Sequence, residues 1–98
     1  MKKSGVELIA EERARQVAAE GWSEAHDDAH PAGELAVAGM CYAGHAGLTL
    51  QGKAGDTVPS PWPWGGEWWK PKNPIRDLVR AGALIAAEID RLQRLKSG

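Results

Sequence analysis

The sequence predicts an all-α protein with three helices and a long loop rich in tryptophan, proline and glycine between the second and the third. Apolar residues recur at helical spacing in three segments, at about 4–20, 31–46 and 74–96. Glycine or proline stands at an edge of each segment, where helices commonly begin or end. At 98 residues the chain has room for one domain, which we expect to span 1–98.

The first helix is expected over about 4–20, because its apolar residues share a face and Gly21 stands just past its end. Arg13 falls in the middle of that apolar face. A buried guanidinium needs an anionic partner. Arg13 is therefore expected either to form a structural ion pair or to bind an anion such as phosphate.

Residues 22–30 are polar and are expected to connect the first two helices. Pro31 suits the first turn of the second helix, over about 31–46, and Asp28 or His30 could cap it. Many alanines and glycines in this helix would let a neighbouring helix approach closely.

The long connection spans 48–73 and holds four of the five tryptophans, with a possible short strand at 48–50. A loop of this length in a small domain is usually either functional or disordered. The third helix starts at Asn73-Pro74, with asparagine as the N-cap and proline at the first helical position. Its regular apolar stripe consists of Ile75, Leu78, Gly82, Ile85, Ile89 and Leu92.

Composition limits the possible functions. Sixteen residues are alanine and none is phenylalanine, so the core is thin and we expect homo-oligomerisation to support it. The single cysteine excludes an internal disulfide, and a net charge of −1 gives no general basic surface for DNA or RNA. No apolar run suits a membrane span or a signal peptide, so we expect a soluble protein in the cytoplasm.

The densest polar cluster is His26-Asp27-Asp28-Ala29-His30, with Glu34 four residues further on. Side chains of these types could ligate a divalent metal ion. Aspartates near a helix start can equally cap its free amides. Both interpretations stay open at this stage.

The tryptophans of the long loop, Trp62, Trp64, Trp68 and Trp69, carry the most specific signal. Indoles stack on flat bases, and the basic residues that follow could meet phosphates. Those residues are Lys70, Lys72, Arg76 and Arg80. The combination predicts a site for an aromatic anion such as a nucleotide, although the indoles could instead fill a core that has no phenylalanine.

Nearly the whole chain resembles a group of small, mostly uncharacterised proteins encoded by phages and prophages. The motifs that carry the resemblance are Glu-Arg-x-Arg-Gln at 12–16, Gly21-Trp22, His-Asp-Asp-x-His at 26–30, Gly-Glu-Leu-Ala at 33–36, Tyr42-Ala43, Trp-Pro-Trp at 62–64, Trp-Trp-Lys-Pro at 68–71, Arg-Asp-Leu-Val at 76–79 and Ala-Gly-Ala-Leu-Ile at 81–85. The resemblance implies expression in the cytosol of an infected host cell.

Two better-understood groups are similar in type. Phage anti-defence sponges are small oligomers that sequester cyclic dinucleotide or cyclic ADP-ribose signals of host immunity. MazG-like all-α pyrophosphohydrolases are helical and Mg²⁺-dependent, with Glu-Glu-x-x-Glu on one helix. This chain has Glu11-Glu12 but Arg15 at the third carboxylate position, and Glu88-Ile-Asp90 departs from the second acidic motif.

The leading hypothesis is a non-catalytic, cofactor-free binder of a nucleotide-derived small molecule, acting as a sponge for a host immune signal. Its expected ligand-binding residues are Arg13, Trp22, His26, Asp27, Asp28, His30, Glu34, Trp64, Trp68, Trp69, Lys70, Arg76, Asp77 and Arg80. One alternative is a nucleotide pyrophosphohydrolase that would hold Mg²⁺ through Glu11, Asp27, Asp28, Glu34 and Asp77. A further alternative is a protein-interaction module that inhibits a host enzyme.

Overall fold

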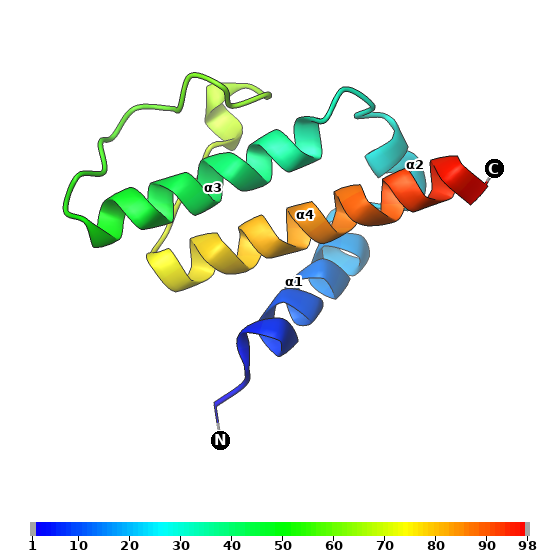
Figure 1. Ribbon diagram of the computed structural model, residues 1–98, viewed down its shortest axis with the longest axis horizontal. Helices are drawn as coiled ribbons and strands as arrows, with labels where there is room; N and C mark the ends of the chain where they lie inside the picture. The colour runs from blue at the N-terminus through cyan, green and yellow to red at the C-terminus, as the bar shows by residue number, and fades with distance from the viewer. Residues whose placement is uncertain (1, 98) are drawn as a thin grey trace.

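The computed structural model describes residues 2–97, which form four α-helices and one 3-10 turn without any β-strand (Figure 1). The elements are α1 (Gly5–Glu20), α2 (Glu24–Asp28), α3 (Glu34–Leu50), η1 (Gly66–Trp68) and α4 (Pro74–Ser97). The all-α fold class is confirmed, but the described residues form four helices where three were expected. The expected domain bounds, 1–98, also include Met1 and Gly98, which lie outside the described residues.

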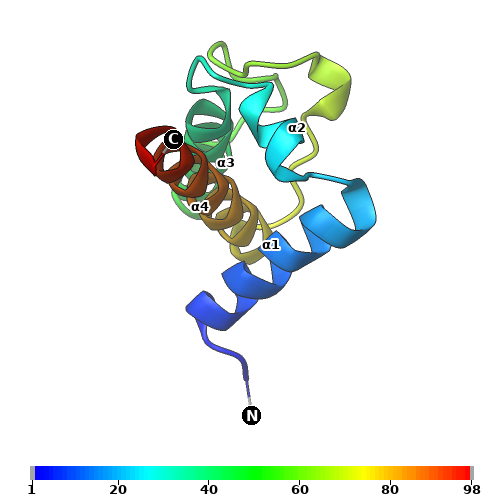
Figure 2. The same cartoon turned by 90° about the vertical axis from the view of Figure 1, so that its right-hand side faces the viewer.

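Helix α4 is the central element. Helix α3 packs along it, α1 crosses it, and the short α2 touches it as well. Figure 2 shows α1 diverging from the α3–α4 pair, with the N-terminus outermost. The long loop after α3 folds back beside that helix (Figures 1 and 2).

The predicted first helix is confirmed. Ser4 caps it, because its hydroxyl accepts from the Glu7 amide at 3.1 Å while the Glu7 carboxylate accepts from the Ser4 amide at 3.0 Å. The hydrogen bond from the Ser4 amide lowers the pKa of Glu7. Gly21 ends the helix with φ 68°, in the left-handed region that favours glycine.

We expected residues 22–30 to be a polar connector without a helix. They contain the short helix α2. Ser23 acts as an N-cap, and its hydroxyl accepts from the His26 amide at 3.2 Å. The serine supplies the acceptor that a single helical turn needs at its start. A serine directly after the Gly21 helix stop was the available sequence signal.

The predicted start and end of the second long helix were wrong. Gly33 has φ 83°, so residues 31–33 form a turn and α3 begins only at Glu34. Asp28 and His30 do not cap it, because the N-cap position is Gly33 and no side chain caps the helix there. The proposed strand at 48–50 is the last turn of α3.

The start of α4 is as predicted, and Asn73 Oδ1 accepts from the Arg76 amide at 2.9 Å. The core lies between α3 and α4 and is closed by an indole of the loop; its buried residues are Leu35, Ala38, Cys41, Tyr42, Trp62, Ala81, Leu84 and Ala87. At Gly39 a Cβ would lie 3.1 Å from the Ala81 carbonyl oxygen, so glycine permits the close α3–α4 approach.

The apolar stripe of α4 does not form the interior. Its aliphatic residues remain at least two-fifths exposed, while the face turned inward carries alanines and charged residues such as Asp77, Glu88 and Arg91. The Arg91 Nε donates to Glu88 Oε1 at 2.5 Å, which pairs these two buried charges. Within residues 2–97 no helix is both long enough and apolar enough to cross a bilayer.

Candidate functional site

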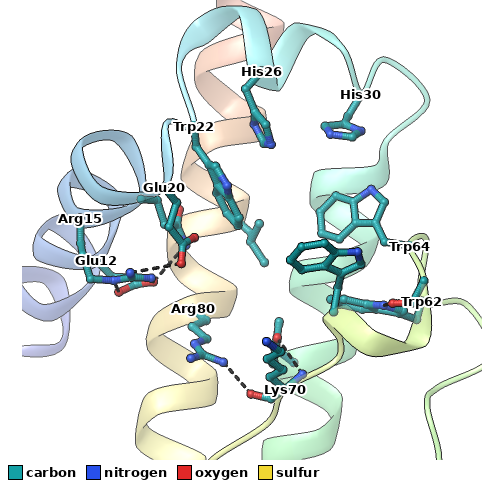
Figure 3. Close-up of a pocket in the computed structure, with 15 residues that line it drawn as sticks. Glu12, Arg15, Glu20, Trp22, His26, His30, Trp62, Trp64, Lys70 and Arg80 are labelled. Carbon is teal, nitrogen blue, oxygen red and sulfur yellow. Dashed lines mark hydrogen bonds and ion pairs between the residues drawn. The ribbon is translucent and has the colours of Figure 1, made fainter.

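A pocket of about 710 Å³ opens between the α1–α2 segment and the tryptophan-rich loop. In Figure 3, Trp22, Glu20 and Arg15 lie across the opening from Trp64 and Trp62. His26 and His30 lie at one end of the pocket, and Lys70 and Arg80 lie at the other. The full lining is Glu12, Arg15, Gln16, Glu20, Trp22, His26, His30, Tyr42, Trp62, Trp64, Gly65, Trp68, Lys70, Arg80 and Leu84.

Four rings form an arc around the histidine end of the pocket. Trp22 stacks on His26 with ring centroids 5.1 Å apart and planes 6° from parallel. His26 meets His30 edge-to-face at 5.1 Å, and His30 meets Trp64 in the same way at 5.3 Å. Contacts of this kind hold the rings in fixed mutual orientations. The arc therefore joins α2 to the loop.

The arc continues into the core through Trp62. Its ring lies 5.3 Å from that of Trp64, 5.5 Å from that of Tyr42 and 5.0 Å from that of Trp69. The Trp62 indole N–H donates to the Gly65 carbonyl at 3.2 Å, which satisfies its one polar group. Trp69 stacks on Tyr42 at 4.8 Å. The loop is thus tied to α3 by aromatic packing.

A buried carboxylate fixes the orientation of His26. Asp27 is completely buried, and its Oδ1 lies 3.0 Å from His26 Nδ1. Its other oxygen accepts from Arg13 Nη2 at 2.9 Å. Carboxylate and guanidinium neutralise each other, and the remaining acceptor favours the His26 tautomer with a proton on Nδ1. Asp27 and Arg13 thus support the pocket from behind.

The α1 wall of the pocket is polar and buried. Glu12 and Gln16 are each only 2% exposed. Both oxygens of the Glu12 carboxylate accept at 2.8 Å from Arg15, and Arg76 of α4 also pairs with it. Burial raises the pKa of Glu12, but the hydrogen bond from Arg15 and the charges of Arg76 and Arg15 outweigh it and lower that pKa overall. The same hydrogen bond with Glu12 raises the pKa of Arg15.

The opposite end of the pocket is basic. The Lys70 ammonium lies 5.9 Å from the centroid of the Trp68 ring, and within residues 2–97 no carboxylate forms an ion pair with it. Arg80 donates from Nη1 to the Lys70 carbonyl at 2.6 Å, and its guanidinium carbon lies 5.7 Å from the Tyr42 ring centroid. Both cations therefore lie against aromatic faces.

Two polar atoms of the lining residues have no hydrogen-bond partner in the described chain. They are Gln16 Oε1, an acceptor, and Trp64 Nε1, a donor. Buried polar groups are normally paired, and an unpaired one costs about 1–3 kcal/mol. Both atoms are buried, so a ligand can reach them only if its entry moves the groups that cover them.

Half of the expected ligand-binding residues line this pocket: Trp22, His26, His30, Trp64, Trp68, Lys70 and Arg80. Arg13 and Asp27 lie behind it, as described above. The others have different surroundings. Trp69 packs on Tyr42, and Arg76 pairs with Glu12 at the edge of the pocket.

The remaining three predicted residues have local partners. Asp28 pairs with Arg94 at 2.8 Å on the surface. Glu34 lies 3.7 Å from His30 and accepts from the Ala32 amide at 2.6 Å. The pKa of Glu34 is lowered, mainly by the hydrogen bond from its own backbone amide. The Ala32 amide and His30 lower this pKa further, while burial raises it. Asp77 is buried and accepts from the Lys72 amide at 2.8 Å.

The carboxylates of the Mg²⁺ alternative are not brought together. Glu11 pairs with Lys3 at 2.5 Å on the exposed side of α1, and the other four are held by the separate partners described above. Nowhere in the described part of the chain do three or more histidine, cysteine or acidic side chains form a group suited to a metal ion.

Sequence reasoning missed the polar wall and one of the rings. The missed residues are Glu12, Arg15, Gln16, Glu20 and Tyr42. Trp62 was named with the other tryptophans of the loop but was not among the expected ligand-binding residues, and it lines the pocket as well. A signal was present in the Glu-Arg-x-Arg-Gln motif, because Glu12, Arg15 and Gln16 are three and four residues apart and share a helix face.

Comparison of the chain with protein-family models, with curated proteins and with solved structures finds no match.

Proposed function

We propose that the pocket binds a small anionic molecule with a planar ring, of the nucleotide-derived class, and that the protein holds this ligand without converting it. The observation that carries the proposal is the pair of Trp68 and Lys70 at the pocket. Trp68 is 62% exposed, and an unpaired ammonium lies above its ring. An exposed indole beside a free cation suits a base and its phosphate.

The charges of the lining favour an anion over a cation. Three cations, Arg15, Lys70 and Arg80, face two carboxylates, Glu12 and Glu20. Both carboxylates are already bound to Arg15. Lys70 and Arg80 therefore remain as the charges that a ligand phosphate would meet.

The same pairing favours binding over catalysis. Glu12 accepts from two guanidinium groups, and its lowered pKa keeps it ionised. A carboxylate so occupied is a poor general acid or base at neutral pH. We therefore propose that the ligand remains intact, as sequestration of a host immune signal would require.

Calorimetric titration tests this proposal. The ligands are nucleoside triphosphates, cyclic dinucleotides and cyclic ADP-ribose isomers, each with and without Mg²⁺, and each mixture is then separated by HPLC. We expect at least one ligand to bind and to be recovered unchanged. Metal-dependent turnover would show an enzyme instead, and the absence of any binding would contradict the proposed ligand class.

Substitutions test whether the ligand binds in the pocket. Trp68→Ala should weaken binding by about 5- to 150-fold, the equivalent of about 1–3 kcal/mol for one stacked base. Lys70→Ala should weaken it as well, and more strongly at low salt. Lys53→Ala is the matched control, because Lys53 is exposed in the same loop but does not line the pocket. Unchanged affinity in Trp68→Ala would contradict stacking on this indole.

A further inference from the structure

Gln16 is a buried lining residue of the pocket whose side-chain carbonyl oxygen has no partner. The residue is 2% exposed, and its Oε1 makes no hydrogen bond within the described chain. Buried polar groups are normally paired, so an unpaired one in a pocket lining points to a group that arrives with a ligand. The chemistry of this free atom therefore constrains the ligand.

Glu12 fixes which atom of the Gln16 amide is left free. Gln16 Nε2 donates to Glu12 Oε2 at 3.2 Å. Glu12 is ion-paired with Arg15 and Arg76, and an ionised carboxylate can only accept hydrogen bonds. The amide must therefore turn its NH2 group to Glu12, because the reverse orientation would set two acceptors against each other. The free atom is a carbonyl oxygen, which requires a donor.

His26 and Glu20 give the rest of the α1–α2 wall the same polarity. Asp27 Oδ1 lies 3.0 Å from His26 Nδ1, so the lone pair of the neutral imidazole is on Nε2. Glu20 adds a carboxylate, which Arg15 binds through one oxygen at 3.2 Å. This wall of the pocket therefore presents acceptors and not donors.

The other lining groups have the opposite polarity. Trp64 Nε1 is a buried donor without a partner in the described chain, and Trp64 lies across the opening from Glu20 (Figure 3). Lys70 and Arg80 carry positive charge at the end of the pocket away from the histidines. A ligand phosphate accepts hydrogen bonds and therefore belongs at Lys70 and Arg80. The α1–α2 wall is left for a part of the ligand that donates.

We propose that Gln16 determines which ring the pocket accepts, by taking a hydrogen bond from an exocyclic amino group on that ring. The inference rests on the proposed function, because it specifies the ring of the same nucleotide-derived ligand. An amino group conjugated with a ring offers two N–H donors and no acceptor. A ring N–H of a base lies beside a carbonyl oxygen, which would face the acceptors of the wall. Adenine, cytosine and guanine carry such an amino group, whereas uracil and hypoxanthine do not.

The burial of Gln16 Oε1 makes this hydrogen bond strong. An acceptor usually loses bound water when a ligand arrives, which leaves a small net gain. Gln16 Oε1 has already lost that water on folding, so the new bond is gained almost in full. The groups that cover Oε1 must move as a ligand enters. That movement is common to two ligands that differ only by an amino group, so their comparison isolates the hydrogen bond.

The first test compares such ligands on the wild-type protein by calorimetric titration. The matched pairs are ATP with purine riboside 5′-triphosphate, GTP with ITP, and cyclic di-GMP with cyclic di-IMP. In each pair that binds, the amino-bearing member should bind about 5- to 150-fold more tightly. Equal affinity within a binding pair would overturn this inference and leave the proposed function intact. The absence of binding by all six ligands would contradict both.

The second test removes the acceptor with Gln16→Met, which keeps a buried side chain of similar length. The amino-bearing ligand should lose affinity until the members of a pair differ by less than about 2-fold, while the affinity for the amino-free member stays unchanged. Gln51→Met is the matched control and should keep the full preference, because Gln51 is exposed at the end of α3 and does not line the pocket. A preference that survives in Gln16→Met, or an equal loss for both members, would overturn the role of Gln16.

Discussion

The two walls of the pocket are built from different chemistry. The wall from α3 and the loop is a set of packed rings, with Trp62 in contact with Tyr42, Trp64 and Trp69. The wall from α1 and α2 is a set of buried polar groups, with Glu12, Gln16 and Asp27 at most 2% exposed.

The difference predicts how each wall responds to change. Apolar burial depends little on pH, so the aromatic wall should tolerate acid and fail when a ring is removed. The polar wall depends on paired charges, so a neutral substitution should weaken it, and acid should weaken it through Glu12, whose pKa is lowered in the folded chain. Four substitutions test this contrast, from the largest expected effect to the smallest.

Trp62→Ala should cause the largest loss of stability. Trp62 is 8% exposed, and its removal would leave a cavity in the aromatic wall. We expect the free energy of unfolding to fall by about 3–5 kcal/mol, measured by urea denaturation, with little dependence on pH. Trp68→Ala is the control and should change stability by less than about 1 kcal/mol, because that ring is mostly exposed. Equal losses in both variants would refute the packing role of Trp62.

Asp27→Asn should have the next largest effect. The substitution keeps the shape of the side chain but removes the charge that pairs with Arg13 and orients His26. We expect a loss of about 3 kcal/mol in urea denaturation. Asp28→Asn, at the neighbouring position, removes a surface pair with Arg94 and should cost less than about 1 kcal/mol. The contrast fails if the two variants are equally stable.

Glu12→Gln should cost about 2 kcal/mol near neutral pH, the scale of hydrogen bonds to a charged group. The pKa of Glu12 is lower in the folded chain than its ordinary value of 4.5. The Glu12 carboxylate therefore stabilises the folded state fully at pH values above 4.5. That contribution is lost as the pH falls through the folded pKa. The gap in unfolding free energy between wild type and variant should therefore narrow below about pH 4.5. A constant gap across the titration would show that steric effects, and not ionisation, cause the loss.

The sequence predicted those parts of the fold that depend on local signals. Ser4, Gly21, Asn73 and Pro74 set helix ends through their own backbone and side-chain chemistry, and three of the helix boundaries lie at or beside them. Gly33 misled the prediction. Gly33 has a left-handed conformation, so α3 starts only at the next residue, Glu34. From the sequence alone, a glycine two residues after a proline could belong either to a turn or to a helix.

The site was only half predictable, because its other half depends on tertiary contacts. Trp22, Trp64 and Trp68 stand out in the sequence as large aromatic residues. Glu12 and Gln16 look like ordinary surface residues of a helix. They are buried in the folded chain, where α1 packs against α4 and Arg76 of α4 pairs with Glu12, a contact between residues 64 positions apart. The regular apolar stripe of α4 is visible in the sequence, but its spacing alone did not predict that its aliphatic residues are at least two-fifths exposed.

Glu11→Gln should have the smallest effect of the four, although Glu11 adjoins Glu12. Its partner is Lys3, and both side chains are about half exposed, so solvent screens the pair. We expect a change of less than about 0.5 kcal/mol in urea denaturation, and no change in the response of the melting temperature to Mg²⁺. The same substitution at adjacent positions thus separates a buried, arginine-bound carboxylate from a solvated one. A loss as large as that of Glu12→Gln would mean that α1 is rotated about its axis, so that Glu11 and not Glu12 faces α4.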